Sequence, residues 1–312
     1  CEKYFPASSK KRMLEIVGNL QKALAQRISE ATWMSEPTKA QAKDKLEHFI
    51  VKIGYPDKWK DYTNLVINDS LSLYENLANI KEYFWIDDLN RKVGKPVDKT
   101  EWLMSPQTIN AYYNPTTNEI CFPAGILQPP FFDPESDDAI NYGAIGVVIG
   151  HELTHGFDDQ GCQFDKTGNQ RNWWTEADKT TYDKRTKVLE DYFSNIEVVN
   201  GKKINGKQTL GENIGDNGGL NVALRAMHNA GTAAAEIDGL KADQRFFLGW
   251  ARIWASNNRP EYMDMLLTND VHSPNIARVN GALPHIDEWY TAFGIKKSDK
   301  LYIPKNKRAH IW

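Results

Sequence analysis

Near its middle the chain contains the segment Ile149-Gly150-His151-Glu152-Leu153-Thr154-His155, in which two histidines stand four residues apart in an apolar setting. On a helix, residues four apart share one face, so His151 and His155 can direct ring nitrogens at one metal ion. Glu152 is rotated by about 100° from His151 and lies beside that ion. A carboxylate in this place can take a proton from a zinc-activated water. The segment therefore predicts a zinc site on a helix.

A catalytic zinc site needs a third protein ligand, and the sequence must supply it elsewhere. A chance match to H-E-x-x-H on a surface helix would have no such third ligand. The metzincin continuation requires Gly and His where this chain has Asp158 and Gly161. The short thermolysin-type spacing requires Glu at Trp174, and Glu176 misses that spacing. Both of these patterns are excluded.

The remaining candidate for a third ligand is the segment 211–216, with Glu212 and Asp216 one helical turn apart. Glu212 can bind a metal, and Asp216 can hold a ligand histidine through its other ring nitrogen. Taken alone, a glutamate and an aspartate at this spacing are more typical of an exposed helix face. The segment is therefore a candidate that needs further support.

The composition is that of a folded protein of 312 residues with a formal net charge of −3. That charge gives no basic field for nucleic acid, and no apolar run reaches the length of a membrane span. Three cysteines, Cys1, Cys121 and Cys162, make no disulfide framework. They fit a reducing compartment, and they equally fit an exported bacterial protein.

Hydrophobic periodicity and turn residues predict a mainly α protein with a small antiparallel β-sheet, an α+β fold. A Gly-Lys-Pro turn at 94–96 favours a division into a helical segment, 1–95, and a catalytic domain, 96–312. We expect helices over 11–31, 37–51, 70–88 and 137–158, another helix beginning near Glu212, and a hairpin of strands at 108–113 and 118–122. His285 and His310 are expected at the surface.

Several motifs together resemble the neprilysin and endothelin-converting-enzyme family of zinc metallopeptidases, over essentially the whole chain. They are the segments 110–113, 118–120, 122–132, 148–159, 212–219, 259–262, 271–274 and 278–281. The resemblance implies a thermolysin-like catalytic domain and one Zn²⁺ per chain, bound by His151, His155 and Glu212. It also implies that Glu152 is the general base and that Asp216, with Asp158 as a weaker candidate, supports a ligand histidine.

The resemblance further implies a peptide-binding cleft around the metal. Asn110 and the Ala111 backbone would bind the substrate main chain as an added strand. His272 would stabilise the oxyanion, and Arg278 would hold a substrate carbonyl. The side chain after the scissile bond would enter an apolar pocket formed by Ile126, Phe131, Val147, Val148, Ile253 and Trp254. The expected activity is endopeptidase cleavage of short peptides on the amino side of apolar residues.

The chain also departs from the eukaryotic members of this family. It ends Ala309-His310-Ile311-Trp312, where those members have a Cys three residues before the Trp. This favours a bacterial member, exported or in the cell envelope, with the cytoplasm left open. The resemblance begins in mid-family, so we expect a C-terminal catalytic fragment without the N-terminal capping domain. The alternative function is a catalytically weak, peptide-binding fragment of such a peptidase.

Overall fold

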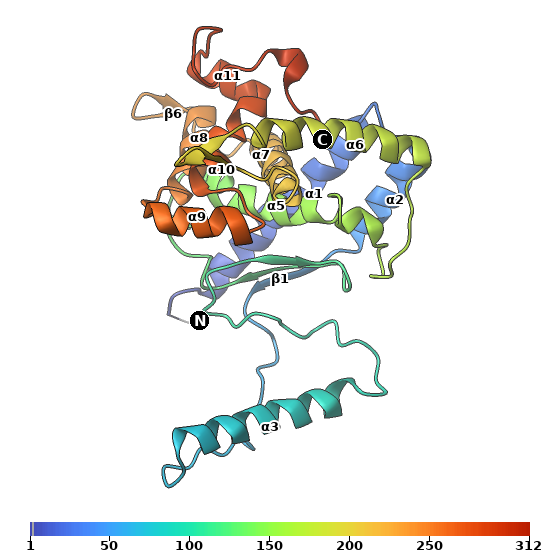
Figure 1. The fold of residues 1–312 in the computed structure, drawn as a ribbon, viewed down its shortest axis with the longest axis vertical. Helices are drawn as coiled ribbons and strands as arrows, with labels where there is room; N and C mark the ends of the chain where they lie inside the picture. The colour runs from blue at the N-terminus through green and yellow to red at the C-terminus, as the bar shows by residue number, and fades with distance from the viewer. Residues whose placement is uncertain (2) are drawn as a thin grey trace.

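The computed structural model describes residues 1 and 3–312, and it confirms the mainly α fold with small sheets. The α-helices are α1 (Ala7–Glu30), α2 (Glu36–Glu47), α3 (Leu73–Lys92), α4 (Asp138–Asn141), α5 (Val147–His155), α6 (Glu176–Phe193), α7 (Leu210–Ala230), α8 (Ala242–Ile253), α9 (Pro260–Asn269), α10 (Asn275–Asn280) and α11 (Asp287–Phe293). The strands are β1 (Ile50–Gly54), β2 (Tyr112–Asn114), β3 (Glu119–Pro123), β4 (Glu197–Val199), β5 (Lys202–Lys203), β6 (Glu236–Ile237) and β7 (Leu240–Lys241). In Figure 1 the helices gather above the sheet that contains β1, and α3 lies apart below it.

The main sheet has the strand order β1-β3-β2. The predicted hairpin is confirmed, since β2 pairs antiparallel with β3, with Tyr113 opposite Ile120, but its first strand is Tyr112–Asn114 and the predicted start at residue 108 is wrong. The predicted continuation of the second helix to Val51 is wrong, because residues 50–54 form β1 and pair in parallel with β3. Ile50, Val51 and Ile53 are β-branched, which favours an extended backbone beside a partner strand. The sheet is therefore mixed, with an antiparallel hairpin and one parallel strand.

The predicted helix over 137–158 is a succession of three helical pieces. A π-helical turn, Tyr142–Gly146, joins α4 to α5, and α5 ends at His155. The chain folds back at once after α5. A β-carbon on Gly161 would lie 1.7 Å from the carbonyl oxygen of His155, so only glycine fits this return. The motif helix is therefore shorter than its apolar pattern indicates.

Helices α5 and α7 cross at very short range, and glycines make this possible. A β-carbon on Gly215 would lie 2.7 Å from the ring of His151, and one on Gly218 would lie 2.4 Å from Oγ1 of Thr154. Without side chains at these positions, the two backbones approach closely. This crossing brings the start of α7, and with it Glu212, opposite the histidine face of α5.

Helix α3 stands apart from the rest of the chain (Figure 1). It spans Leu73–Lys92, against the predicted 70–88, and begins at a capping box between Ser72 and Glu75. None of its residues is buried. Its exposed apolar side chains are Leu73, Tyr74, Leu77, Phe84, Trp85, Ile86 and Leu89. So large an apolar surface on one helix is typical of a face that another partner covers.

One hydrophobic core contains buried side chains from both ends of the chain, including Met13 and Leu20 of α1 as well as Ile149 and Leu220. The helices before β1 therefore pack with the motif helix and do not form a unit of their own. The proposed division of the chain at residue 95 stays a prediction. No helix among the described residues is long and apolar enough to cross a membrane.

The C-terminal segment is held by a buried histidine, and the expected surface position of His285 is wrong. His285 is 2% exposed, and its Nδ1 accepts a hydrogen bond of 3.0 Å from the backbone N–H of Ala309. Its ring packs edge-on against Tyr192. Burial lowers the pKa of His285 to about 4. His285 is therefore neutral in the folded protein at neutral pH, whereas His310 is exposed as predicted.

This arrangement predicts an acid-sensitive fold. An unfolded histidine has a pKa of about 6.5, so the stability from neutral His285 is complete above that pH and is lost as pH falls towards 4. From pH 7 to pH 5 we expect His285 to account for a loss of about 2 kcal/mol in the free energy of unfolding. Urea titrations at both pH values measure it. In His285→Asn, which keeps an acceptor but cannot titrate, this part should vanish, whereas His48→Asn, at an exposed histidine, should behave like the wild type. Equal pH dependence in all three proteins would contradict the assignment.

Candidate metal centre and active site

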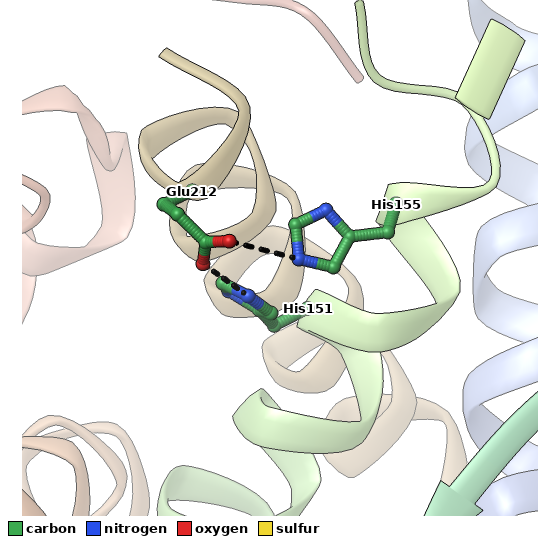
Figure 2. Close-up of side chains that lie close together, drawn as sticks. All are labelled: His151, His155 and Glu212. Atoms are coloured by element: carbon green, nitrogen blue, oxygen red, sulfur yellow. Dashed lines mark ion pairs between the residues drawn. The ribbon is translucent and has the colours of Figure 1, made fainter. Parts of the chain in front are cut away.

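Two imidazoles from α5 and one carboxylate from α7 converge on a single point. Ligand atoms of His151, His155 and Glu212 all lie within 4.8 Å of one another. Nε2 of His151 is 3.0 Å from one carboxylate oxygen of Glu212, and Nε2 of His155 is 3.7 Å from the other. Figure 2 shows both rings directed at the Glu212 carboxylate from the neighbouring helix. The structure thus brings together the three predicted ligands, although Glu212 lies more than fifty residues after the two histidines in the sequence.

The chemistry of this cluster fits a zinc ion. Two histidine nitrogens and a carboxylate are a donor set of catalytic zinc sites. Oε2 of Glu212 is buried and makes no hydrogen bond of acceptable geometry among the described residues. Burial alone would raise the pKa of Glu212, but the three neighbouring imidazoles outweigh burial and hold that pKa well below its usual range. An ionised, buried carboxylate oxygen facing two imidazoles is a place that a cation would satisfy.

Each candidate ligand histidine is held from behind by a carboxylate. Nδ1 of His151 lies 2.8 Å from Asp216, and Nδ1 of His155 lies 2.6 Å from Asp158. Burial alone would lower the pKa of His151, but contacts with Asp216 and Glu212 raise it to about 10. Such carboxylates fix the ring orientation and leave Nε2 free for a metal. Asp158 lies as close to His155 as Asp216 lies to His151, so each aspartate can orient one candidate ligand histidine.

Asp216 also binds Arg278, which is buried. The guanidinium donates Nε–H to one carboxylate oxygen at 2.8 Å and Nη2–H to the other at 2.6 Å. Its plane lies 4.0 Å from the ring centre of Trp254. Burial alone would raise the pKa of Asp216, but Arg278 and His151 outweigh burial and lower it. Among the described residues Nη1 has no partner, so this part of Arg278 is free to reach a substrate carbonyl.

His272 is the most exposed of the site histidines. Its side chain is 46% exposed, and its Nε2 lies 3.2 Å from Oε2 of Glu212. Its Nδ1 lies 2.7 Å from Asp270, a residue that the sequence reasoning missed although it stands only two positions earlier. The next residue, Ser273, donates a buried hydrogen bond of 2.7 Å to Asn213 of α7. The loop carrying His272 is therefore tied to the helix carrying Glu212.

Glu152 takes no part in these pairings among the described residues. Its side chain is largely buried, with 8% of the residue exposed, and among the described residues nothing forms a hydrogen bond with its carboxylate. Neighbouring positions on a helix differ in direction by about 100°, so Glu152 lies beside the face that carries His151 and His155. The Glu152 carboxylate lies beside the candidate metal ligands and has no hydrogen-bond partner among the described residues, so it is available to a water molecule.

The predicted peptide-binding strand lies at an open sheet edge. β2 pairs only with β3, so its other edge is unpaired in the described part of the chain. Just before it, Asn110 is exposed, and its Oδ1 accepts the N–H of Ala111 at 2.9 Å. Tyr113 of β2 lines a cavity of about 430 Å³ together with His155 and Glu212. An extended peptide lying along this edge would pass the three candidate metal ligands.

The predicted apolar pocket is divided between core and surface. Val147 and Ile126 are buried members of the core. The other four side chains are half-buried and pack against that core: Phe131, Val148, Ile253 and Trp254. The half-buried residues are those that a bound side chain could reach. That these six residues line one pocket stays a prediction.

The site and the helical scaffold match the pattern of one class, the metallopeptidases of the H-E-x-x-H type, in which a glutamate on a second helix is the third ligand. Comparison with known families agrees. A family model described as Peptidase family M13 matches residues 110–309, and a second model with the same description matches residues 1–56. The chain belongs to peptidase family M13. This confirms the resemblance to neprilysin and the endothelin-converting enzymes.

Individual relatives give the same result. The chain is 39% identical over 315 residues to the neutral endopeptidase of Lactobacillus helveticus, covering 100% of this chain and 46% of that protein. It is 40% identical over 319 residues to human endothelin-converting enzyme 1, covering 99% and 41%. The structure of the zinc metalloprotease Zmp1 of Mycobacterium tuberculosis with an inhibitor superposes with a TM-score of 0.93 at 44% identity, covering 97% and 47%. The chain spans less than half the length of these relatives.

Proposed function

We propose that the protein is a zinc-dependent endopeptidase. The observation that carries this proposal is the convergence of His151, His155 and Glu212 on one point, with the unpaired Glu152 carboxylate beside them. Zinc proteases among the solved relatives support it. One Zn²⁺ per chain, held by these three ligands, would supply the Lewis acid for peptide hydrolysis.

Other residues of the chain have separate roles in the proposed reaction. Glu152 takes the proton of the attacking water and passes it to the leaving amine. His272, oriented by Asp270, donates to the oxygen that becomes negative in the transition state. Asp216 and Asp158 hold the two ligand histidines in one ring orientation. Arg278, fixed by Asp216, binds a substrate carbonyl through its free Nη1.

The substrates we propose are short peptides bound in an extended form. Asn110 and the backbone of Ala111 would bind the peptide main chain at the open edge of β2. The half-buried Phe131, Val148, Ile253 and Trp254 would receive the side chain after the scissile bond, which favours cleavage on the amino side of apolar residues. Mapping cleavage sites in a peptide library by mass spectrometry tests this preference.

We also propose that a capping domain covers this site in a longer protein. The support is the apolar, unburied surface of α3 and the greater length of the relatives, which are more than twice as long. Without a cap the cleft would be wetter and less restrictive for substrate size. An exported or cell-envelope location stays a prediction that none of these observations tests.

A short fluorogenic peptide tests the proposed activity. We expect cleavage that stops when a chelator removes the metal and returns when Zn²⁺ is added back. Cleavage that survives complete removal of zinc would contradict the proposal. Tight binding of zinc and peptide without any cleavage would favour the alternative, a peptide-binding fragment without catalytic power.

A further inference from the structure

A buried lysine contacts the loop that follows His155, and the proposed mechanism does not use it. Lys45 stands near the end of α2 and is 1% exposed. Its ammonium group donates three hydrogen bonds, each 2.7 Å long, to the carbonyl oxygens of Gly156, Gly161 and Phe164. A lysine has three N–H donors, and here every one is used within a single loop.

The loop that Lys45 binds, residues 156–164, connects directly to the metal centre. It follows His155 and carries Asp158, whose Oδ2 lies 2.6 Å from Nδ1 of His155. The other oxygen, Oδ1, accepts the backbone N–H groups of Gln160 at 2.9 Å and Gly161 at 2.7 Å. Asp158 thus binds N–H groups of the loop, while Lys45 binds its carbonyl groups.

The surroundings of the Lys45 ammonium group favour a positive charge. The carbonyl of Gly156 stands at the C-terminal end of α5, which carries partial negative charge, and a buried cation there is stabilised. Aromatic rings of Tyr113, Phe157 and Trp173 surround the ammonium group at 5.7–5.9 Å. Without the ammonium group, the buried carbonyl of Gly156 would have no donor among the described residues, whereas Gly161 and Phe164 would keep one donor each, from the N–H of Phe164 and from Nε1 of Trp173.

We propose that Lys45 is a positioning residue for the metal centre, an inference that rests on the proposed zinc site. Lys45 fixes the loop 156–164, the loop fixes Asp158, and Asp158 fixes the ring of His155. Lys45 belongs to the segment 1–56, matched by one family model, whereas the loop belongs to the segment matched by the other. The first segment therefore contributes to the geometry of a metal site whose ligands all lie in the second.

The test is the rate at which the zinc-loaded protein releases zinc to a chelator. Loss of a residue that orients a metal ligand typically costs about 10–100-fold in metal affinity, so we expect Lys45→Met to release zinc at least about tenfold faster than the wild type. The visible spectrum of the Co²⁺-substituted protein should also shift, because it reports ligand geometry.

Lys52→Met is the matched control. Lys52 is also buried and pairs with Glu119 at 2.7 Å, but it makes no hydrogen bond to the loop in the described part of the chain. Its loss should lower thermal stability and leave zinc release and the Co²⁺ spectrum unchanged. Similar zinc release from the wild type and Lys45→Met would overturn the inference. Equal acceleration in both lysine variants would do the same, since it would show an effect of stability alone.

A double-mutant cycle tests the route through Asp158. Lys45→Met, Asp158→Asn and the double variant should be non-additive in zinc release, because the two residues act in series; simple additivity would overturn this route. If Lys45→Met does not fold, Lys45→Arg replaces it. The planar guanidinium cannot aim three donors at these carbonyls, so release should still be faster than in the wild type, and an unchanged rate would overturn the inference. A folded wild type that binds no zinc would instead refute the proposed function.

Discussion

Glu152→Gln is expected to retain zinc while peptide cleavage falls by about 100-fold to 10,000-fold, the range typical for loss of a general base. Glutamine keeps the shape of the side chain but cannot accept the proton of the attacking water. Because the Glu152 carboxylate makes no hydrogen bond with the described residues, the substitution breaks no side-chain hydrogen bond there. Steady-state cleavage of a fluorogenic peptide, with zinc content measured on the same sample, gives both readings.

The zinc measurement is what makes this result specific. A variant that loses activity together with zinc would show a structural effect and would not identify the base. A variant that keeps zinc and retains half of the wild-type rate would show that Glu152 does not accept the proton. We expect its melting temperature to stay close to that of the wild type.

Glu212→Ala is expected to lose zinc under conditions in which the wild type retains one equivalent. The substitution removes one of three candidate ligands and the only negative charge among them. Loss of a residue that merely orients a ligand costs about 10–100-fold in metal affinity, so loss of the ligand itself should cost at least about 100-fold. Elemental analysis after dialysis against a weak chelator measures this, and cleavage should disappear in parallel.

Glu176→Ala is the matched control for this prediction. Glu176 is the glutamate nearest the spacing of a thermolysin-type third ligand, but the structure places it, exposed, at the start of α6. This variant should keep zinc and activity. Full zinc occupancy in Glu212→Ala, or loss of zinc from Glu176→Ala, would contradict the assignment of the third ligand.

The histidine pair of the metal centre could be predicted from the sequence because its information is local, whereas Glu212 was assigned as the third ligand through the family resemblance. The pairing of His151 with His155 depends only on helical spacing, and Glu212 precedes Asp216 by one turn of another helix. Spacing alone could not show that these helices meet. The structure shows this at Gly215 and Gly218, where missing side chains allow α5 and α7 to cross.

Features that depend on distant partners were predicted less well. Residues 50–54 continue an apolar pattern from α2, and only their pairing with β3 makes them a strand. His285 was expected at the surface because its type is polar, but the segment that contains Ala309 packs against it and buries it. Lys45 stands on α2, and its ammonium group binds a loop more than one hundred residues later in the chain, so helical spacing could not indicate these hydrogen bonds.

The central claim is that one zinc ion is bound by His151, His155 and Glu212, and anomalous X-ray scattering at the zinc absorption edge tests it most directly. We predict one strong peak per chain, about 2.0–2.1 Å from Nε2 of each histidine and about 2.0–2.2 Å from a carboxylate oxygen of Glu212. A crystal grown with zinc that shows no peak there would contradict the account. So would a peak bound by the two histidines with Glu212 turned away.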